Sequence, residues 1–171
     1  KTIDYYAFAD CNNLYEIEIP QGVVNIGEKA FARLDNLKNI DIPDSVTNIT
    51  TLAFYRCNGL VSVQVPGSVT AIKNGTFREC NNLKKVILNE GVAKIEDSAF
   101  VFCSSLEQIK LPQSLMSIGS GAFDNCTSLI SVELPDNAII SSSTFRGCKN
   151  LSKIVLSDTN NNYIVKKWHF I

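Results

Sequence analysis

Apolar residues recur along this chain with a period of 23 residues, and every copy carries a phenylalanine preceded five residues earlier by an isoleucine. The phenylalanines are Phe8, Phe31, Phe54, Phe77, Phe100, Phe123 and Phe145, the last of them after an interval of 22. A constant period over most of a chain is the mark of one supersecondary unit that is repeated and stacked. The pattern therefore predicts a solenoid rather than a fold built around one central core.

Each copy contains one segment in which apolar and polar positions alternate. A leucine stands six residues after the phenylalanine, and aliphatic residues stand nine and eleven residues after it. A period of two is typical of a strand with one face toward a core. The predicted strands are 15–19, 38–42, 61–65, 84–88, 107–111, 130–134 and 152–156. Proline has no N–H for a sheet ladder, so it ends the five strands that it follows, at Pro20, Pro43, Pro66, Pro112 and Pro135.

The rest of each copy must return the chain to the start of the next strand. A turn of small residues follows the proline, and a second short extended segment is predicted between this turn and the isoleucine. Alanine beside phenylalanine, with Asn or Ser pairs downstream as at Ser104 and Ser105, predicts a single helical turn. Strands joined by crossovers of this length pair in parallel, and such crossovers are right-handed.

The repeat unit resembles a known leucine-rich repeat. Residues 106–126 read LEQIKLPQSLMSIGSGAFDNC, which is similar to the 23-residue repeat of the BspA type, also called the Treponema pallidum class, and the match spans residues 3 to about 156. The resemblance implies an α/β solenoid: a right-handed curved coil with a parallel β-sheet on its concave face and short helical turns and extended segments on the other faces. It also implies adhesion or protein binding at the cell surface or outside the cell.

One departure from ordinary leucine-rich repeats lies in the turn after each strand. Those repeats place an asparagine ladder there, whereas this chain has Ser or Gly in all copies but the sixth, which has Asn137. The geometry of the convex side is therefore left open by the sequence.

The period divides the chain into two parts. Residues 1–156 form the seven-copy repeat domain, and we interpret residues 157–171 as a degenerate eighth repeat or C-terminal cap, because Trp168 stands 23 residues after Phe145. The functional alternative for this tail is an aromatic docking spot built from Tyr163, Trp168 and Phe170. The first copy has no polar capping segment before it, which favours a fragment of a longer array.

Composition argues against several classes of partner. A net charge of -1 makes nucleic acid or an acidic membrane a poor main partner. No stretch approaches the roughly 20 consecutive apolar residues of a membrane span, so we expect no membrane insertion by this segment.

The cysteines follow the repeat, since each stands three residues after a phenylalanine, at Cys11, Cys57, Cys80, Cys103, Cys126 and Cys148. Leu34 takes this place in the second copy, and a leucine can replace a buried thiol but not a metal ligand. Side chains of a ladder point the same way, which is poor geometry for a disulfide. We therefore predict buried free thiols in preference to disulfides or a metal site.

Residues that carry out catalysis are not apparent in the sequence. The single His169 lies outside the repeats, and no zinc spacing, phosphate-binding glycine loop or dinucleotide motif occurs. We expect a protein that is not an enzyme and that uses no metal and no cofactor.

The outward side chains of the predicted strands form two columns on the concave sheet. The first column, eight residues after each phenylalanine, contains Glu16, Asn39, Ser62, Lys85, Gln108, Ser131 and Lys153. The second column, ten residues after it, contains Glu18, Asp41, Gln64, Ile87, Lys110, Glu133 and Val155. These positions vary without cost to the core, so we expect a ligand site among them.

The predicted site is centred where Ile87, expected to be exposed, stands among lysines. Its residues are Lys85, Ile87, Gln108, Lys110, Gln64, Asp41, Glu18 and Glu16. The predicted function is a protein- or glycan-binding module of a cell-surface or secreted protein, which adheres to host or extracellular-matrix partners. The alternative is a spacer or scaffold that projects another domain and has no specific ligand.

Overall fold

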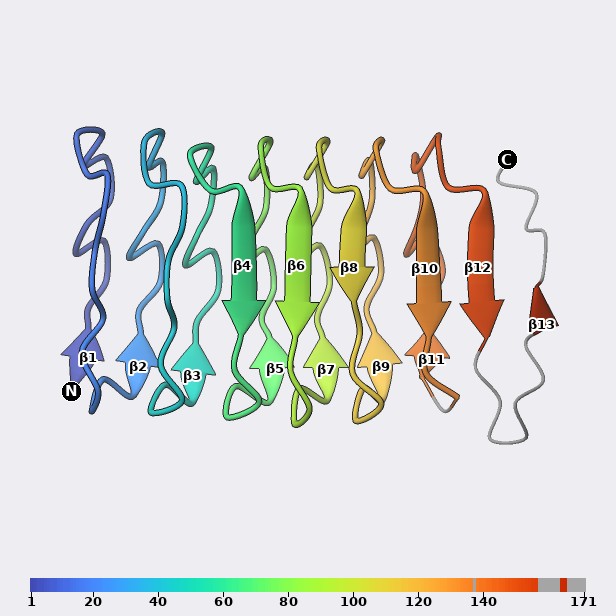
Figure 1. The fold of residues 1–171 in the computed structure, drawn as a ribbon, viewed down its shortest axis with the longest axis horizontal. Helices are drawn as coiled ribbons and strands as arrows, with labels where there is room; N and C mark the ends of the chain where they lie inside the picture. Colours follow the sequence, from blue (N-terminus) through green and yellow to red (C-terminus); the bar gives the residue numbers. More distant parts are fainter. Residues whose placement is uncertain (137, 157–163, 166–171) are drawn as a thin grey trace.

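The computed structural model describes residues 1–136, 138–156 and 164–165, which form a row of stacked coils from the N-terminus to the C-terminus (Figure 1). We number the coils 1 to 7, so that coil 1 contains Phe8 and coil 7 contains Phe145. The front strands run down in Figure 1, the rear strands run up and the coils advance to the right, so the coil is right-handed, as predicted. The chain is thus a solenoid, and the crossover rule holds for it.

The front layer consists of the longer strands, and we call its solvent side the long-strand face. The strands are β4 (Ser62–Val65), β6 (Lys85–Leu88), β8 (Gln108–Lys110), β10 (Ser131–Leu134) and β12 (Lys153–Leu156). Strands β4, β6 and β8 pair in parallel with equivalent residues opposite each other, for example Lys85 opposite Gln108, and β10 pairs with β12 in the same way. Among the described residues, no ladder joins β8 to β10. The predicted parallel pairing is therefore confirmed within coils 3 to 5 and between coils 6 and 7.

The rear layer consists of two-residue strands that contain the isoleucine of each copy, which confirms the second extended segment. They are β1 (Thr2–Ile3), β2 (Asn25–Ile26), β3 (Asn48–Ile49), β5 (Ala71–Ile72), β7 (Lys94–Ile95), β9 (Ser117–Ile118) and β11 (Ile139–Ile140). Strands β1 to β3 form one parallel sheet, and β5, β7, β9 and β11 form another.

Strands at 15–19 and 38–42 in the first two coils were predicted, and this prediction is wrong. In segments 15–19 and 38–42 the structure has only an isolated bridge between Glu18 and Asp41. Carboxylates placed side by side repel each other, and Asp, Asn and Glu are poor strand residues. The later strands, such as Lys85–Leu88, are rich in Val, Ile and Leu and form regular ladders.

The predicted helical turn around each phenylalanine is also wrong, because the described residues contain no helix. These segments are successive turns. In coil 1, Ala7 N–H donates to the Asp4 carbonyl and Phe8 N–H donates to Ala30 of the next coil, at 3.2 and 2.8 Å. Alternate N–H groups thus leave the segment to bond the neighbouring coil, so an i to i−4 ladder cannot form.

A ladder of stacked phenylalanine rings occupies the core. The centroids of neighbouring rings lie 5.2 to 5.5 Å apart with interplanar angles of 4 to 10°. The rings from Phe31 to Phe123 are fully buried, whereas Phe8 at the N-terminal end is only partly buried. Each ring is therefore held by the adjacent coils and not by its own copy.

Serines join the turns that follow the long segments, where the sequence left the geometry open. The hydroxyls of Ser45, Ser68 and Ser114 donate to a valine carbonyl of the preceding coil at 2.8, 2.6 and 3.0 Å. The prolines also act as predicted, because the carbonyl of Pro66, for example, closes a turn by accepting from Val69 N–H at 3.1 Å. Serine thus supplies a contact between coils in this turn.

The C-terminal tail is described only at β13 (Ile164–Val165), which pairs with β12 in antiparallel orientation. A further repeat strand would run parallel to β12, so this pairing covers the edge of the sheet in a different way. Tyr163, Trp168 and Phe170, named for the cap or the docking spot, lie outside the described residues.

Candidate ligand-binding site on the long-strand face

Both predicted columns point outward on the long-strand face. Lys85, Gln108 and Lys110 are exposed, as are Asp41 and Gln64, and the residues between them on the strands, such as Val63 and Val86, are buried. Alternation along each strand therefore separates a variable polar surface from the apolar core.

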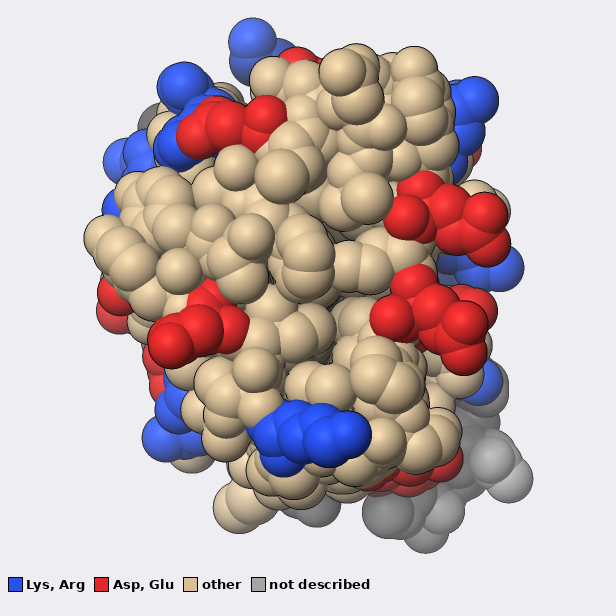
Figure 2. All heavy atoms as spheres, turned by 90° about the vertical axis from the view of Figure 1, so that its left-hand side faces the viewer, with Lys and Arg blue, Asp and Glu red and all other residues tan. Residues whose placement is uncertain are grey.

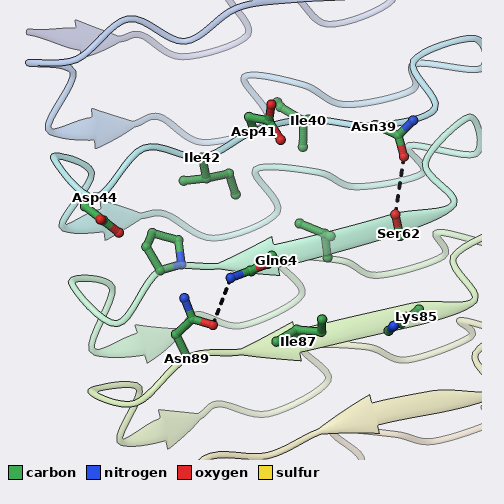
Figure 3. A pocket seen from close by; sticks show the side chains of 12 residues that line it. Asn39, Ile40, Asp41, Ile42, Asp44, Ser62, Gln64, Lys85, Ile87 and Asn89 are labelled. Carbon is green, nitrogen blue, oxygen red and sulfur yellow. Dashed lines mark hydrogen bonds between the residues drawn. The ribbon is translucent and has the colours of Figure 1, made fainter.

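This face contains a hollow of about 400 Å³ that spans coils 2 to 4 (Figure 3). Its lining residues are Asn39, Ile40, Asp41, Ile42, Asp44, Ser62, Val63, Gln64, Pro66, Lys85, Ile87 and Asn89. The lining combines aliphatic side chains, amides and charged groups of both signs. Below, "the hollow" always refers to this site.

The hollow lies at one interruption of the front sheet, between coils 2 and 3. Segment 38–42 of coil 2 forms no ladder with β4 of coil 3, although Val61 N–H still donates to the Lys38 carbonyl at 2.9 Å. On its other side β4 pairs with β6 over its full length. The unpaired edge of β4 therefore borders the hollow, and edges of this kind are available for further hydrogen bonding.

Two hydrogen bonds between side chains hold the walls of the hollow. Ser62 Oγ donates to Asn39 Oδ1 at 3.3 Å, and Gln64 Nε2 donates to Asn89 Oδ1 at 3.1 Å, as the dashed lines in Figure 3 show. Each bond joins neighbouring coils. Since an amide has two donor hydrogens and two acceptor sites, Gln64 and Asn89 retain further hydrogen-bonding capacity.

Charge is distributed unevenly along this face. Asp41 and Asp44 of coil 2 lie in the part of the hollow nearest the N-terminal end, and Lys85 of coil 4 lies on the other side (Figure 3). Glu90, next to Asn89, accepts hydrogen bonds from the backbone N–H of Gln113 and of Ser114, which lower the pKa of its carboxyl group. The site is therefore polar and carries both signs of charge.

Ile87 was expected to be exposed, and this expectation is wrong because the residue is half-buried. It lies between Gln64 and Lys110 in the register of the sheet. Ile87 therefore contributes to the floor of the hollow instead of projecting as an isolated apolar anchor.

The structure brings together only half of the residues predicted for the ligand site. Asp41, Gln64, Lys85 and Ile87 line the hollow. Gln108 and Lys110 lie beside them on β8, opposite Lys85 and Ile87. Glu16 and Glu18 belong to coil 1, outside the lining.

Sequence reasoning missed Asp44 and Asn89. Asp44 stands in the turn after Pro43, outside both columns. Asn89 takes the place of the proline that ends most strands, and this substitution was the available signal. The sequence does not reveal that Asn89 forms a hydrogen bond with Gln64, because only the stacking of the coils brings these two residues into contact.

The cysteines form a spine inside the stack, as predicted, except for Cys11, which is exposed. Sγ of Cys80, Cys103, Cys126 and Cys148 each donates to the carbonyl of a phenylalanine in the preceding coil, at 3.0 to 3.2 Å. Burial raises the pKa of the Cys57 thiol to about 12. These thiols stabilise the stack and are not accessible for chemistry.

The described part of the chain contains no group of three or more His, Cys, Asp or Glu side chains placed to hold a metal ion. Across the same residues, no helix has the length and apolar character needed to cross a membrane.

Comparison with known families gives a match over most of the chain. The model of the BspA type leucine rich repeat region matches residues 1–129 and 70–170, in six copies. No curated protein matches the sequence significantly.

Solved structures of similar chains come from several bacteria. A leucine-rich repeat protein from Bacteroides ovatus is 30% identical, with a TM-score of 0.77, over 91% of this chain and 46% of that one. The T. pallidum leucine rich repeat protein is 34% identical, with a TM-score of 0.68, over 72% of this chain and 61% of that one.

A leucine rich cell surface protein from Faecalibacterium prausnitzii is 23% identical, with a TM-score of 0.56, over 88% of this chain and 56% of that one; it shows a shared fold alone. The chain spans about half the length of these structures.

Proposed function

Because the chain belongs to the BspA-type leucine-rich repeat family, we propose that it is a non-enzymatic binding module that recognises a protein or glycan through its long-strand face. The hollow across coils 2 to 4 is the observation that carries this proposal. It combines an aliphatic floor with polar groups that converge from three coils, which is the usual make-up of a binding site.

The scaffold under the hollow favours binding over a purely structural role. Phenylalanine stacking and ladders between coils hold the surface rigid, so ligand contact requires little ordering of the protein. The outward side chains differ from coil to coil, with Asp41, Gln64 and Ile87 at equivalent positions. A spacer without a ligand does not require such a surface.

We place the module at the cell surface or outside the cell, in adhesion to host or matrix partners. The support is family membership and the similar fold of a protein described as a leucine rich cell surface protein. This location is part of the proposal, together with the adhesion itself.

Binding to an array of extracellular-matrix proteins and glycans tests the proposal. We expect at least one ligand whose affinity falls about tenfold or more in the variant Lys85→Glu/Lys110→Glu, since charge reversal on a binding face replaces attraction by repulsion. The matched control is Lys94→Glu/Lys149→Glu, which reverses two exposed lysines away from this face and should bind as the parent chain does.

The outcomes separate the two candidate functions. A ligand that both variants bind equally would move the site away from the long-strand face. Absence of any ligand on the array would favour the scaffold function. Thermal melting of both variants serves as the folding control, because exposed lysines without packing roles contribute little to stability.

A further inference from the structure

We propose that the hollow accepts the side chain of a lysine or arginine from a protein ligand, with its cationic head at Asp41 and Asp44 and its aliphatic stem on the floor. This inference rests on the proposed binding function and specifies its ligand class. It depends on how the hollow distributes charge, apolar surface and hydrogen-bonding capacity.

The acidic end of the hollow carries no ion pair within the described chain. Some carboxylates outside the hollow do pair with a base of an adjacent coil: Asp10 with Arg33, Glu79 with Arg56, and Asp124 with Arg146. Asp41 and Asp44 have no Lys or Arg of the described chain within ion-pair distance. The charge at this end is therefore left for a partner to balance.

The floor fits the aliphatic stem of a long basic side chain. Ile42, Pro66 and Ile87 line the hollow. Figure 3 shows Ile42 between Asp41 and Asp44, and Ile87 beside Lys85. Lys and Arg bury their methylene groups along apolar surface while the charged head stays in a polar environment. The hollow provides both surfaces side by side.

The same lining is poorly suited to a saccharide. None of its side chains is aromatic, so a sugar ring would find no flat face on which to stack. Two amides retain hydrogen-bonding capacity: Gln64 lies on β4, whose edge toward coil 2 is open, and Asn89 follows β6 on the other side of β4. Amides and a strand edge both suit the backbone of a peptide, so the chemistry favours protein over glycan.

Lys85 gives the hollow a direction. Its ammonium group lies in coil 4, away from the two aspartates of coil 2, and repels a second cation of the ligand. The ligand segment therefore places its base toward coil 2 and an uncharged or acidic residue toward coil 4.

Titration of the folded chain with a short peptide, followed by NMR of backbone amides, tests this inference. The probe is N-acetyl-Gly-Arg-Gly-amide, and the comparison peptide replaces arginine by glutamine. We expect the arginine peptide to shift resonances of coils 2 to 4, around Asp41 and Gln64, and the glutamine peptide to leave them in place.

Variants then identify the carboxylates. The variant Asp41→Asn/Asp44→Asn should lower the affinity for the arginine peptide by about tenfold or more, because it removes charge-assisted hydrogen bonds. Glu107→Gln/Glu133→Gln removes the same charge from exposed positions outside the hollow and should leave the affinity unchanged. All four positions are exposed, and amide spectra report folding directly.

Three results would overturn the inference: unchanged affinity in the aspartate variant, equal binding of the glutamine peptide, or shifts confined to other coils. N-acetyllactosamine acting on the hollow in place of the arginine peptide would assign the site to glycans. The arginine peptide could fail to bind while a matrix ligand binds the chain and loses affinity in Lys85→Glu/Lys110→Glu. That outcome removes this inference and leaves the proposed function intact. If the arginine peptide binds in the hollow but no matrix protein or glycan on the array binds the chain, the inference about the hollow stands and the proposed adhesion to matrix partners does not.

Discussion

At the scale of single residues, the backbone conformation around each ladder phenylalanine is the least expected feature. Residues two before and two after it have φ values of 54 to 72° in every coil, and most of them are not glycine, as at Leu52 and Phe102. This left-handed conformation is unfavourable for side chains with a Cβ. It persists because N–H groups of the turn bond the next coil, as Phe77 N–H does to the Ala99 carbonyl at 2.9 Å.

The burial of the cysteine spine leads to a prediction about thiol reactivity. Burial raises the pKa of Cys80, Cys103 and Cys126 well above the usual value, so their thiolate fraction at about pH 8 is very small. Cys11 is exposed. An aromatic disulfide reagent should therefore label one thiol quickly in the folded chain and the rest only after unfolding.

The variant Cys11→Ser is the control for this measurement, because it should abolish the fast phase. Rapid labelling of two or more thiols in the folded chain would contradict the burial of the spine.

At the scale of elements, neighbouring coils approach each other closely at the turns after β4 and β6. A Cβ built on Gly67 would overlap the carbonyl oxygen of Glu90, and one built on Gly91 would overlap that of Gly67. Other coils have a longer residue at the position of Gly67, namely Asp44, Glu90 or Gln113. The close approach is thus a local property of coils 3 and 4, next to the hollow.

This contact predicts the effect of Gly67→Ala. The added methyl group must displace the Glu90 backbone, which should lower the free energy of unfolding by about 1–3 kcal/mol, the usual cost of overpacking. Chemical denaturation measures it. Gln113→Ala at the equivalent turn position of coil 5 is the control and should be nearly neutral, since Gln113 is exposed. Equal stability of the two variants would show that the turns of coils 3 and 4 move apart without cost, which would contradict the tight contact between Gly67 and Glu90.

At the scale of the whole molecule, stability depends on position in the stack. Figure 2 views the N-terminal end, where the centre is uncharged and the charged side chains gather toward the margin. Ile3, Phe8, Leu14 and Ile17 of this first coil are only partly buried, whereas equivalent residues of coil 4 are fully buried. Each coil of a solenoid is stabilised by its neighbours, and coil 1 has one neighbour in the structure.

Identical substitutions in the middle and at the end of the ladder should therefore differ. Phe77 stacks on Phe54 and Phe100 at 5.2 and 5.3 Å, so Phe77→Ala should cost about 3–5 kcal/mol. Phe8 stacks only on Phe31 and is partly exposed, so Phe8→Ala should cost about 1–2 kcal/mol. Denaturant melts of both variants measure the difference, and similar losses would contradict a stack stabilised by its neighbours.

The repeat itself could be predicted from sequence because its signals are local. The 23-residue period, the alternation in strands such as Lys85–Leu88 and the prolines after them indicate which side chains face the core. Parallel pairing follows from the length of the crossovers. Four of the eight predicted ligand-site residues follow from the same alternation and line the hollow, namely Asp41, Gln64, Lys85 and Ile87.

The features that required the tertiary structure all arise between coils. The sheet fails to pair between segment 38–42 and β4, which opens the hollow; the turns around the phenylalanines bond the next coil and exclude a helix. Both features depend on contacts between residues about 23 positions apart. The residue pattern within one copy does not indicate how favourable these contacts between copies are. The sequence by itself determined the period, the core and the outward face of this protein, because these follow from which side chains avoid water. The stacking of the coils decided where the hollow forms on that face. An unpaired strand edge, or a backbone N–H bonded to the next coil, exists only when the neighbouring coil is in place.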